Sequence, residues 1–552
     1  MFSSQLDPSQ RDAALKSLAS NTFDVLVIGG GVTGVGAALD AASRGLKVAL
    51  VEASDLASGT SSRSSKLIHG GLRYLEQYDF KLVREALQER ELMVSTLAPH
   101  LVKPLAFLYP LHEKVRERTY VGAELALYDA LRGFQRALPG HKHLSQKQIA
   151  ATAPSLRSDL VTGAVKYFDA QVDDARHTMM IARTAARHGA VIATNVRVES
   201  LVREGKRVLG VKARDIESGK LITIKATATV MCAGIWSDEL HESFGLKAGY
   251  NVTMSKGVHI VLPKKAIQSK EGIILKTSKS VLFLIPWADK WIGGTTDTPY
   301  TGDRREPIAG RDDVEYIVNE ANKVLKPKLK IEDVIGVYAG LRPLVANKKD
   351  SLTTKISREH TVDRSAPGFV SIAGGKYTTY RIMGKDVIDL AGIELRRIIA
   401  ESVTEKLPIV GADGYFALMQ QIDRIAEDSG LSADSVRHLL DRYGSVISEI
   451  LEIITVDPKL AKQLTKDLPY LKAEIYYAAS HEGARSVDDV ISRRTRLAFE
   501  APDCAIDLVN DVAAIIAPVL GWTAKQKKDS IKAYLDIAER EIESIEATLA
   551  TA

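Results

Sequence analysis

A glycine-rich turn near the start of the chain is the first segment whose residue types and spacing predict chemistry. Gly29, Gly31 and Gly34 form a G-x-G-x-x-G pattern directly after a short apolar run at residues 25–28. The first glycine permits a tight turn, the second lets the backbone approach a pyrophosphate, and the third lets a helix pack closely on a strand. The N-terminus of that helix directs free N–H groups and its dipole at phosphate. The pattern predicts dinucleotide binding; the alternative is a glycine turn with only a packing role.

An acidic residue after the next apolar run supports this interpretation. Glu52 follows a predicted strand at residues 47–51, at close to the expected offset of about 20 residues from the first glycine. A carboxylate there accepts hydrogen bonds from both ribose hydroxyls and repels a 2′-phosphate. The fingerprint alone leaves NAD and FAD as equal candidates.

Three segments rich in small residues are predicted to meet the nucleotide. Residues 57–66 are mostly serine, glycine and threonine, whose hydroxyls and unhindered N–H groups can surround a pyrophosphate and a flavin edge. A plain flexible loop is the alternative there. Ala233 and Gly234 end a later apolar run. Gly374 and Gly375 precede a predicted helix at about 378–399, whose N-terminus would suit phosphate or flavin.

The predicted secondary structure around these segments differs from one part of the chain to the next. Residues 1–22 are predicted to be a loose arm with a short helix at about 10–19, and residues 196–230 alternate as in a β-meander. Residues 101–134 mix apolar and basic groups, which fits either an anionic membrane surface or a solvated face over a core. Helical periodicity dominates from 401 onward.

Composition excludes several classes of protein. The 552 residues suffice for two or three domains, and 45% hydrophobic with 26% charged residues is typical of soluble globular proteins. Cys232 and Cys504 form no C-x-x-C pair, so we expect neither a disulfide framework nor a metal site. So few cysteines also favour a reducing compartment. We expect no signal peptide and no transmembrane helix, because no basic head precedes an apolar core and no apolar run reaches 18 residues.

The net charge of +5 is unevenly distributed. Residues 395–552 carry a net charge of −7, and the remainder, which holds the nucleotide motif, carries +12. This asymmetry suits an anionic substrate, an anionic membrane surface, or both. Nucleic acid is not expected, because no known binding module occurs.

Motifs along nearly the whole chain resemble the FAD-dependent glycerol-3-phosphate dehydrogenases of the bacterial aerobic and mitochondrial type. The most specific segments are residues 60–76, Lys256-Gly-Val-His259, Ile285-Pro-Trp287, Gly294-Thr-Thr-Asp297, Gly340-Leu-Arg-Pro-Leu344, Gly374-Gly-Lys-Tyr-Thr-Thr-Tyr-Arg381 and residues 488–496. The resemblance implies an α/β FAD-binding domain, Rossmann-like and of the glutathione-reductase/D-amino-acid-oxidase type, at residues 23–400. A β-sheet substrate domain, roughly 80–165 and 240–350, would be interleaved with it. An N-terminal arm (1–22) would precede it, and an all-helical domain (401–552) would follow.

The resemblance also implies the reaction. The C2 hydroxyl of sn-glycerol 3-phosphate would be oxidised to dihydroxyacetone phosphate in glycerol catabolism, with hydride transfer to N5 of non-covalently bound FAD and electrons passing to a membrane quinone. The protein would be cytoplasmic and attached peripherally to the cytoplasmic face of the membrane, and a homodimer would be its expected assembly.

The family motifs assign residues to the cofactor. The expected FAD-binding residues are Gly29, Gly31, Gly34, Glu52, Thr60, Ser61, Ser62, His69, Gly70, Ala233, Gly234, Gly374, Gly375 and Thr378. For His69, a structural role or a flavin contact is expected.

The same motifs assign residues to the substrate. Guanidinium groups hold phosphate with two donors in a fixed fork, and a lysine adds a point charge. The expected substrate-binding residues are Arg73, Tyr74, Arg342, Arg358 and Lys376, and Arg381 also lies in a matching motif. An ordinary surface ion pair is the alternative for each basic residue.

Histidine is the favoured base, because its ordinary pKa lies near the working pH. His259 is the preferred candidate, as base or substrate-orienting group, and a proton route through an arginine or water stays open. Arg342 and Lys376 would manage the developing alkoxide charge.

Two features that some family members carry are absent from this sequence, and each absence argues against one property. No EF-hand pattern occurs, so calcium regulation is not expected. The mid-chain insertion of the soluble oxidases is absent, which favours a dehydrogenase. The alternatives are a glycerol-3-phosphate oxidase that reduces O2 to H2O2, an amino-acid or sarcosine-type flavin oxidase, and a flavin-binding sensor without turnover.

Overall fold

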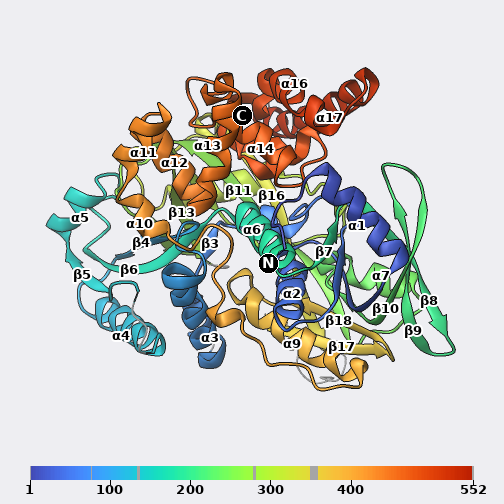
Figure 1. Ribbon diagram of the computed structural model, residues 1–552. Helices are drawn as coiled ribbons and strands as arrows, with labels where there is room; N and C mark the ends of the chain where they lie inside the picture. The colour runs from blue at the N-terminus through green and yellow to red at the C-terminus, as the bar shows by residue number, and fades with distance from the viewer. Residues whose placement is uncertain (1, 76–77, 134–136, 278–280, 348–358, 550–552) are drawn as a thin grey trace.

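Two β-sheets and a set of C-terminal helices make up the protein (Figure 1). The computed structural model describes residues 2–75, 78–133, 137–277, 281–347 and 359–549. Within these residues no helix is both long and apolar enough to cross a membrane.

The first sheet carries the glycine turn. Its parallel strands are ordered β18-β10-β1-β2-β7, and the antiparallel strand β17 lies beside β18. Val25 and Val27 of β1 belong to the core under the helices, whereas Leu26 and Ile28 belong to the core on the opposite face. Burial on both faces explains why this strand is an unbroken apolar run. The bounds are β1 Thr22–Ile28, β2 Val48–Val51, β7 Val191–Ala193, β10 Leu221–Met231, β17 His360–Ala366 and β18 Phe369–Gly374.

Helices and a meander cover the two faces of this sheet. Helix α2 (Val32–Ser43) follows the glycine turn and packs against α6 (Asp174–Arg187) and α9 (Tyr380–Gly392). Strands β8 (Val196–Glu204), β9 (Arg207–Asp215) and β10 pair antiparallel in sequence, as the alternating pattern predicts.

The N-terminal arm is packed rather than loose. Its helix α1 (Pro8–Ser20) lies against β10 and β7, and Leu18 is fully buried. Arg11 makes a buried ion pair with Asp215 (2.7 Å). The prediction of a loose arm is wrong, because an apolar stripe and this ion pair dock the helix.

The second, mostly antiparallel sheet has the order β15-β11-β14-β13-β12-β4-β6-β3, with β16 beside β11 and β5 beside β6. Strand β4 lies between β12 and β6, so the apolar part of the 101–134 segment is sheet core and not membrane surface. The bounds are β3 Leu67–Ile68, β4 Val102–Leu111, β5 Lys142–Ser145, β6 Gly163–Val172, β11 Tyr250–Pro263, β12 Gly272–Lys276, β13 Val281–Trp287, β14 Lys290–Gly294, β15 Thr298–Pro299 and β16 Gly336–Asn347. Helices α3 (Phe80–Leu92), α4 (Arg116–Leu131), α5 (Gln146–Thr152) and α8 (Arg311–Ala321) accompany this sheet.

In the described residues after β18, the named elements are all helical. They form two apolar cores, one around α12 to α14 and one around α14 to α17. The helices are α10 Tyr415–Met419, α11 Ile422–Ser429, α12 Ala433–Tyr443, α13 Ile447–Val456, α14 Lys472–Ser480, α15 Leu497–Glu500, α16 Val509–Leu520 and α17 Ala524–Leu549. Between α14 and α15 a short π-helix, Asp489–Arg494, carries part of the 488–496 motif.

Candidate active site

The glycine turn is sterically demanding at two of its three glycines. Gly29 has φ +113°, and a Cβ atom there would lie 2.5 Å from the Cys232 carbonyl oxygen. A Cβ atom on Gly34 would lie 1.9 Å from the Gly29 carbonyl oxygen. At Gly31, the N-cap of α2, it would meet only Ser61 Oγ, at 3.3 Å. The first and third glycines are therefore required by the protein itself, and the second leaves room for a ligand.

Glu52 is held in place at the end of β2. Its carboxylate accepts hydrogen bonds from the backbone N–H groups of Gly30 (2.6 Å) and Ser54 (2.8 Å). Burial raises the pKa of Glu52 above its ordinary value, against the lowering effect of these hydrogen bonds. The carboxylate faces the cavity described below, beside the glycine turn.

The serine-rich loop connects two parts of the fold, helix α2 and the second sheet. Ser61 Oγ accepts a hydrogen bond from the Val32 backbone N–H (2.9 Å), so it caps the first turn of α2. Thr60 Oγ1 donates to the Leu341 carbonyl of β16 (2.7 Å), which ties the loop to the second sheet. A serine 29 positions from the helix it caps lies beyond any local capping pattern in the sequence.

The second pair of glycines also forms a turn. Gly374 and Gly375 have φ +77° and +84°, and a Cβ atom on Gly375 would lie 2.5 Å from Met383 Sδ. Beyond the turn, Thr378 Oγ1 accepts from the His69 backbone N–H and donates to the His69 carbonyl, both at 3.2 Å. These bonds fasten the 69–71 loop to the start of α9.

A cavity of about 930 Å3 runs between the two sheets and the C-terminal helices. Four of the expected FAD-binding residues, Gly34, His69, Gly70 and Thr378, are not among its lining; Gly70 donates to Tyr128 Oη (2.9 Å) instead. The wall also includes C-terminal residues that sequence reasoning did not select, among them Arg496, Trp522 and Tyr534. The expected residues that line the cavity are Gly29, Gly31, Glu52, Thr60, Ser61, Ser62, Ala233, Gly234, Gly374 and Gly375.

His259 lies on β11, behind Tyr338 of β16. The two rings stack at 4.7 Å between centroids with an interplanar angle of 11°, and Nε2 lies 2.8 Å from Ser65 Oγ. Tyr338 lines the cavity, whereas His259 is not part of its lining. Burial, together with the positive charges of Arg342 and Lys66, holds the pKa of His259 well below its ordinary value. The imidazole is therefore neutral at physiological pH.

Arg342 projects from β16 close to the same strand pair. Its Nη1 donates to the Thr296 carbonyl (3.2 Å) and to Asp297 Oδ1 (3.3 Å), and its Nη2 donates to Thr295 Oγ1 (2.9 Å). About a quarter of the side chain is exposed (26%). The guanidinium is thus oriented by the Thr295–Asp297 segment and still accessible.

The remaining candidates for the substrate lie in different environments. Lys376 lines the cavity, and its Nζ lies 3.7 Å from the centroid of the Tyr74 ring. Arg73 precedes Tyr74 in a 3-10 turn, and Arg358 lies outside the described residues. Arg381, which also lies in a matching motif, is buried in an ion pair with Glu89 (Nε–Oε2, 2.8 Å), so a carboxylate from α3 already holds its guanidinium.

The sheet topology, the glycine turn with its carboxylate and the long cavity between two sheets together fit a bound flavin dinucleotide. A family model for "FAD dependent oxidoreductase" matches residues 24–385, and one for the "C-terminal domain of alpha-glycerophosphate oxidase" matches residues 402–527. The protein is therefore an FAD-dependent oxidoreductase, with FAD as its cofactor.

Individual relatives narrow the class to a family. Glycerol-3-phosphate dehydrogenase 2 of Mycobacterium tuberculosis is 50% identical over 537 residues, which cover 97% of this chain and 92% of that protein. The mitochondrial glycerol-3-phosphate dehydrogenase of Homo sapiens is 35% identical over 548 residues, covering 95% of this chain and 74% of that protein. The X-ray structure of the Bacillus halodurans glycerol-3-phosphate dehydrogenase complexed with FAD is 30% identical, with a TM-score of 0.79 over 98% of this chain and 99% of that one. The chain belongs to the FAD-dependent glycerol-3-phosphate dehydrogenase family.

Proposed function

We propose that the protein oxidises the C2 hydroxyl of sn-glycerol 3-phosphate to dihydroxyacetone phosphate and passes the electrons to a membrane quinone, as a step of glycerol catabolism. The observation that carries this proposal is a neutral buried imidazole, His259, beside the positive charge of Arg342. A phosphorylated alcohol needs both a cation for its dianion and a base for its hydroxyl proton. Bound FAD supplies the two-electron acceptor.

Arg342 and Lys376 have the charge to hold the phosphate and to stabilise negative charge on the C2 oxygen. Arg342 offers a planar fork that its Thr295–Asp297 partners already orient. Lys376 adds a point charge at the cavity wall. Family resemblance adds Arg73, Tyr74 and Arg358 to this proposed substrate set, and the expected FAD-binding residues remain the proposed cofactor set.

His259 is the proposed base. Burial depresses its pKa most, and its positive neighbours add to that effect; a phosphate dianion bound to Arg342 would offset the second contribution and raise the pKa toward the working range. Substrate binding would thereby make the imidazole a better proton acceptor when the C2 hydroxyl arrives.

The electron acceptor distinguishes two related functions. A quinone-linked enzyme would contact the cytoplasmic face of the membrane peripherally, which the basic N-terminal 394 residues would favour. A glycerol-3-phosphate oxidase is the second candidate function, because the family model that matches residues 402–527 is described as the C-terminal domain of alpha-glycerophosphate oxidase. We also propose that residues 23–400 and 401–552 form separate domains and that the protein is a homodimer. Comparing activity with a quinone analogue against peroxide formation decides the acceptor; fast peroxide formation without quinone activity would establish the oxidase.

The substrate assignment is tested by anaerobic stopped-flow reduction with glycerol 3-phosphate. We expect rapid bleaching of the flavin in the wild type and a large loss of apparent affinity in Arg342→Ala. Arg214→Ala is the matched control, because Arg214 is an exposed residue of β9 paired with Glu199 (2.6 Å). Equal affinity in Arg342→Ala and Arg214→Ala would remove Arg342 from the phosphate site, and no bleaching in the wild type would reject the substrate.

A further inference from the structure

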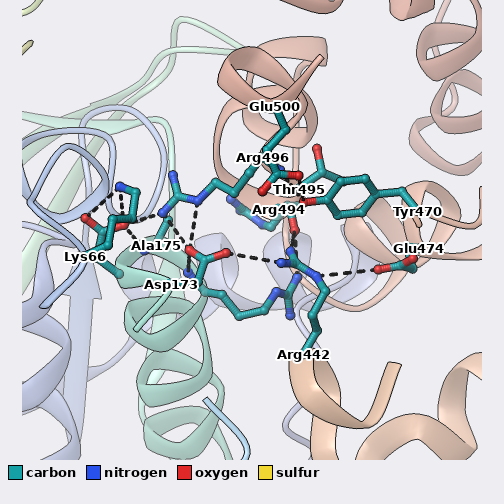
Figure 2. A network of polar contacts seen from close by, with 12 residues as sticks. Lys66, Asp173, Ala175, Arg442, Tyr470, Glu474, Arg494, Thr495, Arg496 and Glu500 are labelled. Atoms are coloured by element: carbon teal, nitrogen blue, oxygen red, sulfur yellow. Dashed lines mark hydrogen bonds and ion pairs between the residues drawn. The ribbon is translucent and has the colours of Figure 1, made fainter. Parts of the chain in front are cut away.

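A buried charge network connects the C-terminal helices to the serine-rich loop (Figure 2). It contains three basic residues and three carboxylates, and each has a side chain no more than 12% exposed. Its charged members are Lys66, Arg442, Arg496, Asp173, Asp174 and Glu474. Positive and negative charges balance within it, which offsets the cost of burying them.

Arg496 occupies the centre of this network. Its Nε and Nη2 donate to Asp173 Oδ1 at 2.9 Å and 2.6 Å, and Nη2 also pairs with Asp174. Its Nη1 donates to the Ser62 carbonyl (3.3 Å). A single guanidinium of the C-terminal part thus contacts both the start of α6 and the backbone of the serine-rich loop.

Ser64 and Lys66 of the same loop both bind Asp174. Asp174 Oδ2 accepts from the Ser64 backbone N–H (2.9 Å) and from Ser64 Oγ (2.6 Å). Lys66 Nζ donates to Asp174 Oδ1 (3.0 Å) and to the Ser62 carbonyl (2.9 Å). Residues 62–66 are therefore held at both ends by Asp174 and its basic partners.

The held loop is part of the cofactor cavity. Ser61, Ser62, Ser64 and Lys66 line it, and so does Arg496. Ser61 caps α2, whose N-terminus is directed at phosphate in this fold. A shift of residues 62–66 would therefore disturb the loop wall and the cap of α2 together.

We propose that Arg496 is a positioning residue for FAD: by fixing Ser62 directly and Ser64 and Lys66 through Asp174, it holds the cofactor loop in its binding conformation. The 488–496 motif then couples the C-terminal domain to FAD affinity. Burial opposes ionisation of Asp173, but Arg496 and Arg442 outweigh it and lower its pKa, so Asp173 is ionised at neutral pH.

Arg442 provides a matched control within the same network. Its Nη1 donates to Asp173 Oδ2 (3.3 Å), its Nη2 donates to the Arg494 carbonyl (2.7 Å), and its Nε lies 3.6 Å from Glu474. In the described part of the chain none of its bonds reaches residues 60–66. Arg442→Lys removes a buried guanidinium fork without touching the cofactor loop.

The test measures the FAD dissociation constant of Arg496→Lys, Arg442→Lys and Ser64→Ala, by fluorescence titration of the apoprotein, together with unfolding free energies. We expect Arg496→Lys to raise the constant by about tenfold, as for loss of a charged hydrogen bond, and Arg442→Lys by no more than about twofold at a similar loss of stability. Equal rises in the two lysine variants, or no rise in Arg496→Lys, would overturn the proposal.

Ser64→Ala keeps the test decisive if Arg496→Lys does not fold. It removes the Ser64 Oγ bond to Asp174 and the bond that Ser64 Oγ accepts from the Lys66 backbone N–H (3.0 Å), and we expect a rise of roughly threefold in the FAD dissociation constant. An unchanged constant in Ser64→Ala would also reject the proposal. When both variants fold, their effects in the double variant should be less than additive, because they act on one loop.

Discussion

Gly34→Ala should disrupt the protein before any cofactor binds. A Cβ atom at this position would lie 1.9 Å from the Gly29 carbonyl oxygen and 3.0 Å from its carbon. An ordinary carbon–oxygen contact is about 3.3 Å, so α2 and the end of β1 would have to separate by more than about 1 Å. Helix α2 is buried on nearly its whole length against α6 and α9, which leaves it no room to move.

The expected magnitude follows from two opposing effects. Overpacking a buried contact costs about 1–3 kcal/mol, and a backbone clash belongs at the upper end. Alanine in place of a helical glycine stabilises the helix by about 1 kcal/mol, because alanine has the higher helix propensity. We therefore expect a net loss of about 2 kcal/mol in the free energy of unfolding of the apoprotein. Gly31→Ala, where the Cβ atom would meet only a serine hydroxyl at 3.3 Å, should leave that value nearly unchanged.

FAD affinity is the second quantity that should distinguish Gly31→Ala from Gly34→Ala. Gly31→Ala should fold and yet lose FAD affinity, because the new methyl group points where the backbone must approach the pyrophosphate. Urea unfolding of both apoproteins and FAD titration of each give the four values needed. A Gly34→Ala apoprotein as stable as the wild type, or a Gly31→Ala protein with wild-type FAD affinity, would refute this account of the glycine turn.

Three further predictions concern burial and charge. Arg381→Gln should lower the free energy of unfolding by about 3–5 kcal/mol in urea titration, because it strands the buried carboxylate of Glu89, and should leave apparent substrate affinity unchanged. Burial lowers the pKa of His177 to about 3, so its contribution to stability is present above its ordinary pKa near 6.5 and is lost as the pH falls toward 3. Unfolding free energies should therefore fall by about 2 kcal/mol more between pH 7 and pH 5 in the wild type than in His177→Phe; equal falls would contradict the assignment. Deleting Ala524–Leu549 removes the cavity wall that includes Tyr534, so released FAD fluorescence should rise faster than in the full chain, and an unchanged release rate would exclude α17 as a wall.

The sequence predicts an element well when all the residues that define the element are close together in the chain. The apolar run, glycine turn and helix of residues 25–43 are adjacent in the chain. Likewise α12 (Ala433–Tyr443), in the segment of predicted helical periodicity, is bounded by a serine N-cap and a following glycine. Segment 101–134 had no comparable signal. Its strand β4 becomes core only through pairing with β6 and β12, and both partners lie tens to more than a hundred residues away.

Charged residues mark the limit of local sequence reasoning most clearly. Arg342 and Arg381 lie in equally specific family motifs, yet Arg342 is oriented by polar groups and about a quarter exposed, whereas Arg381 is consumed by Glu89 of α3. Arg496 shows the reverse case: an arginine in a helical tail lines the cofactor cavity. For Arg381 and Arg496 the role depends on which carboxylate the fold brings within 3 Å, and that partner lies about 300 residues away in the chain. Assigning a buried arginine to a ligand therefore requires first that its nearest carboxylates be known.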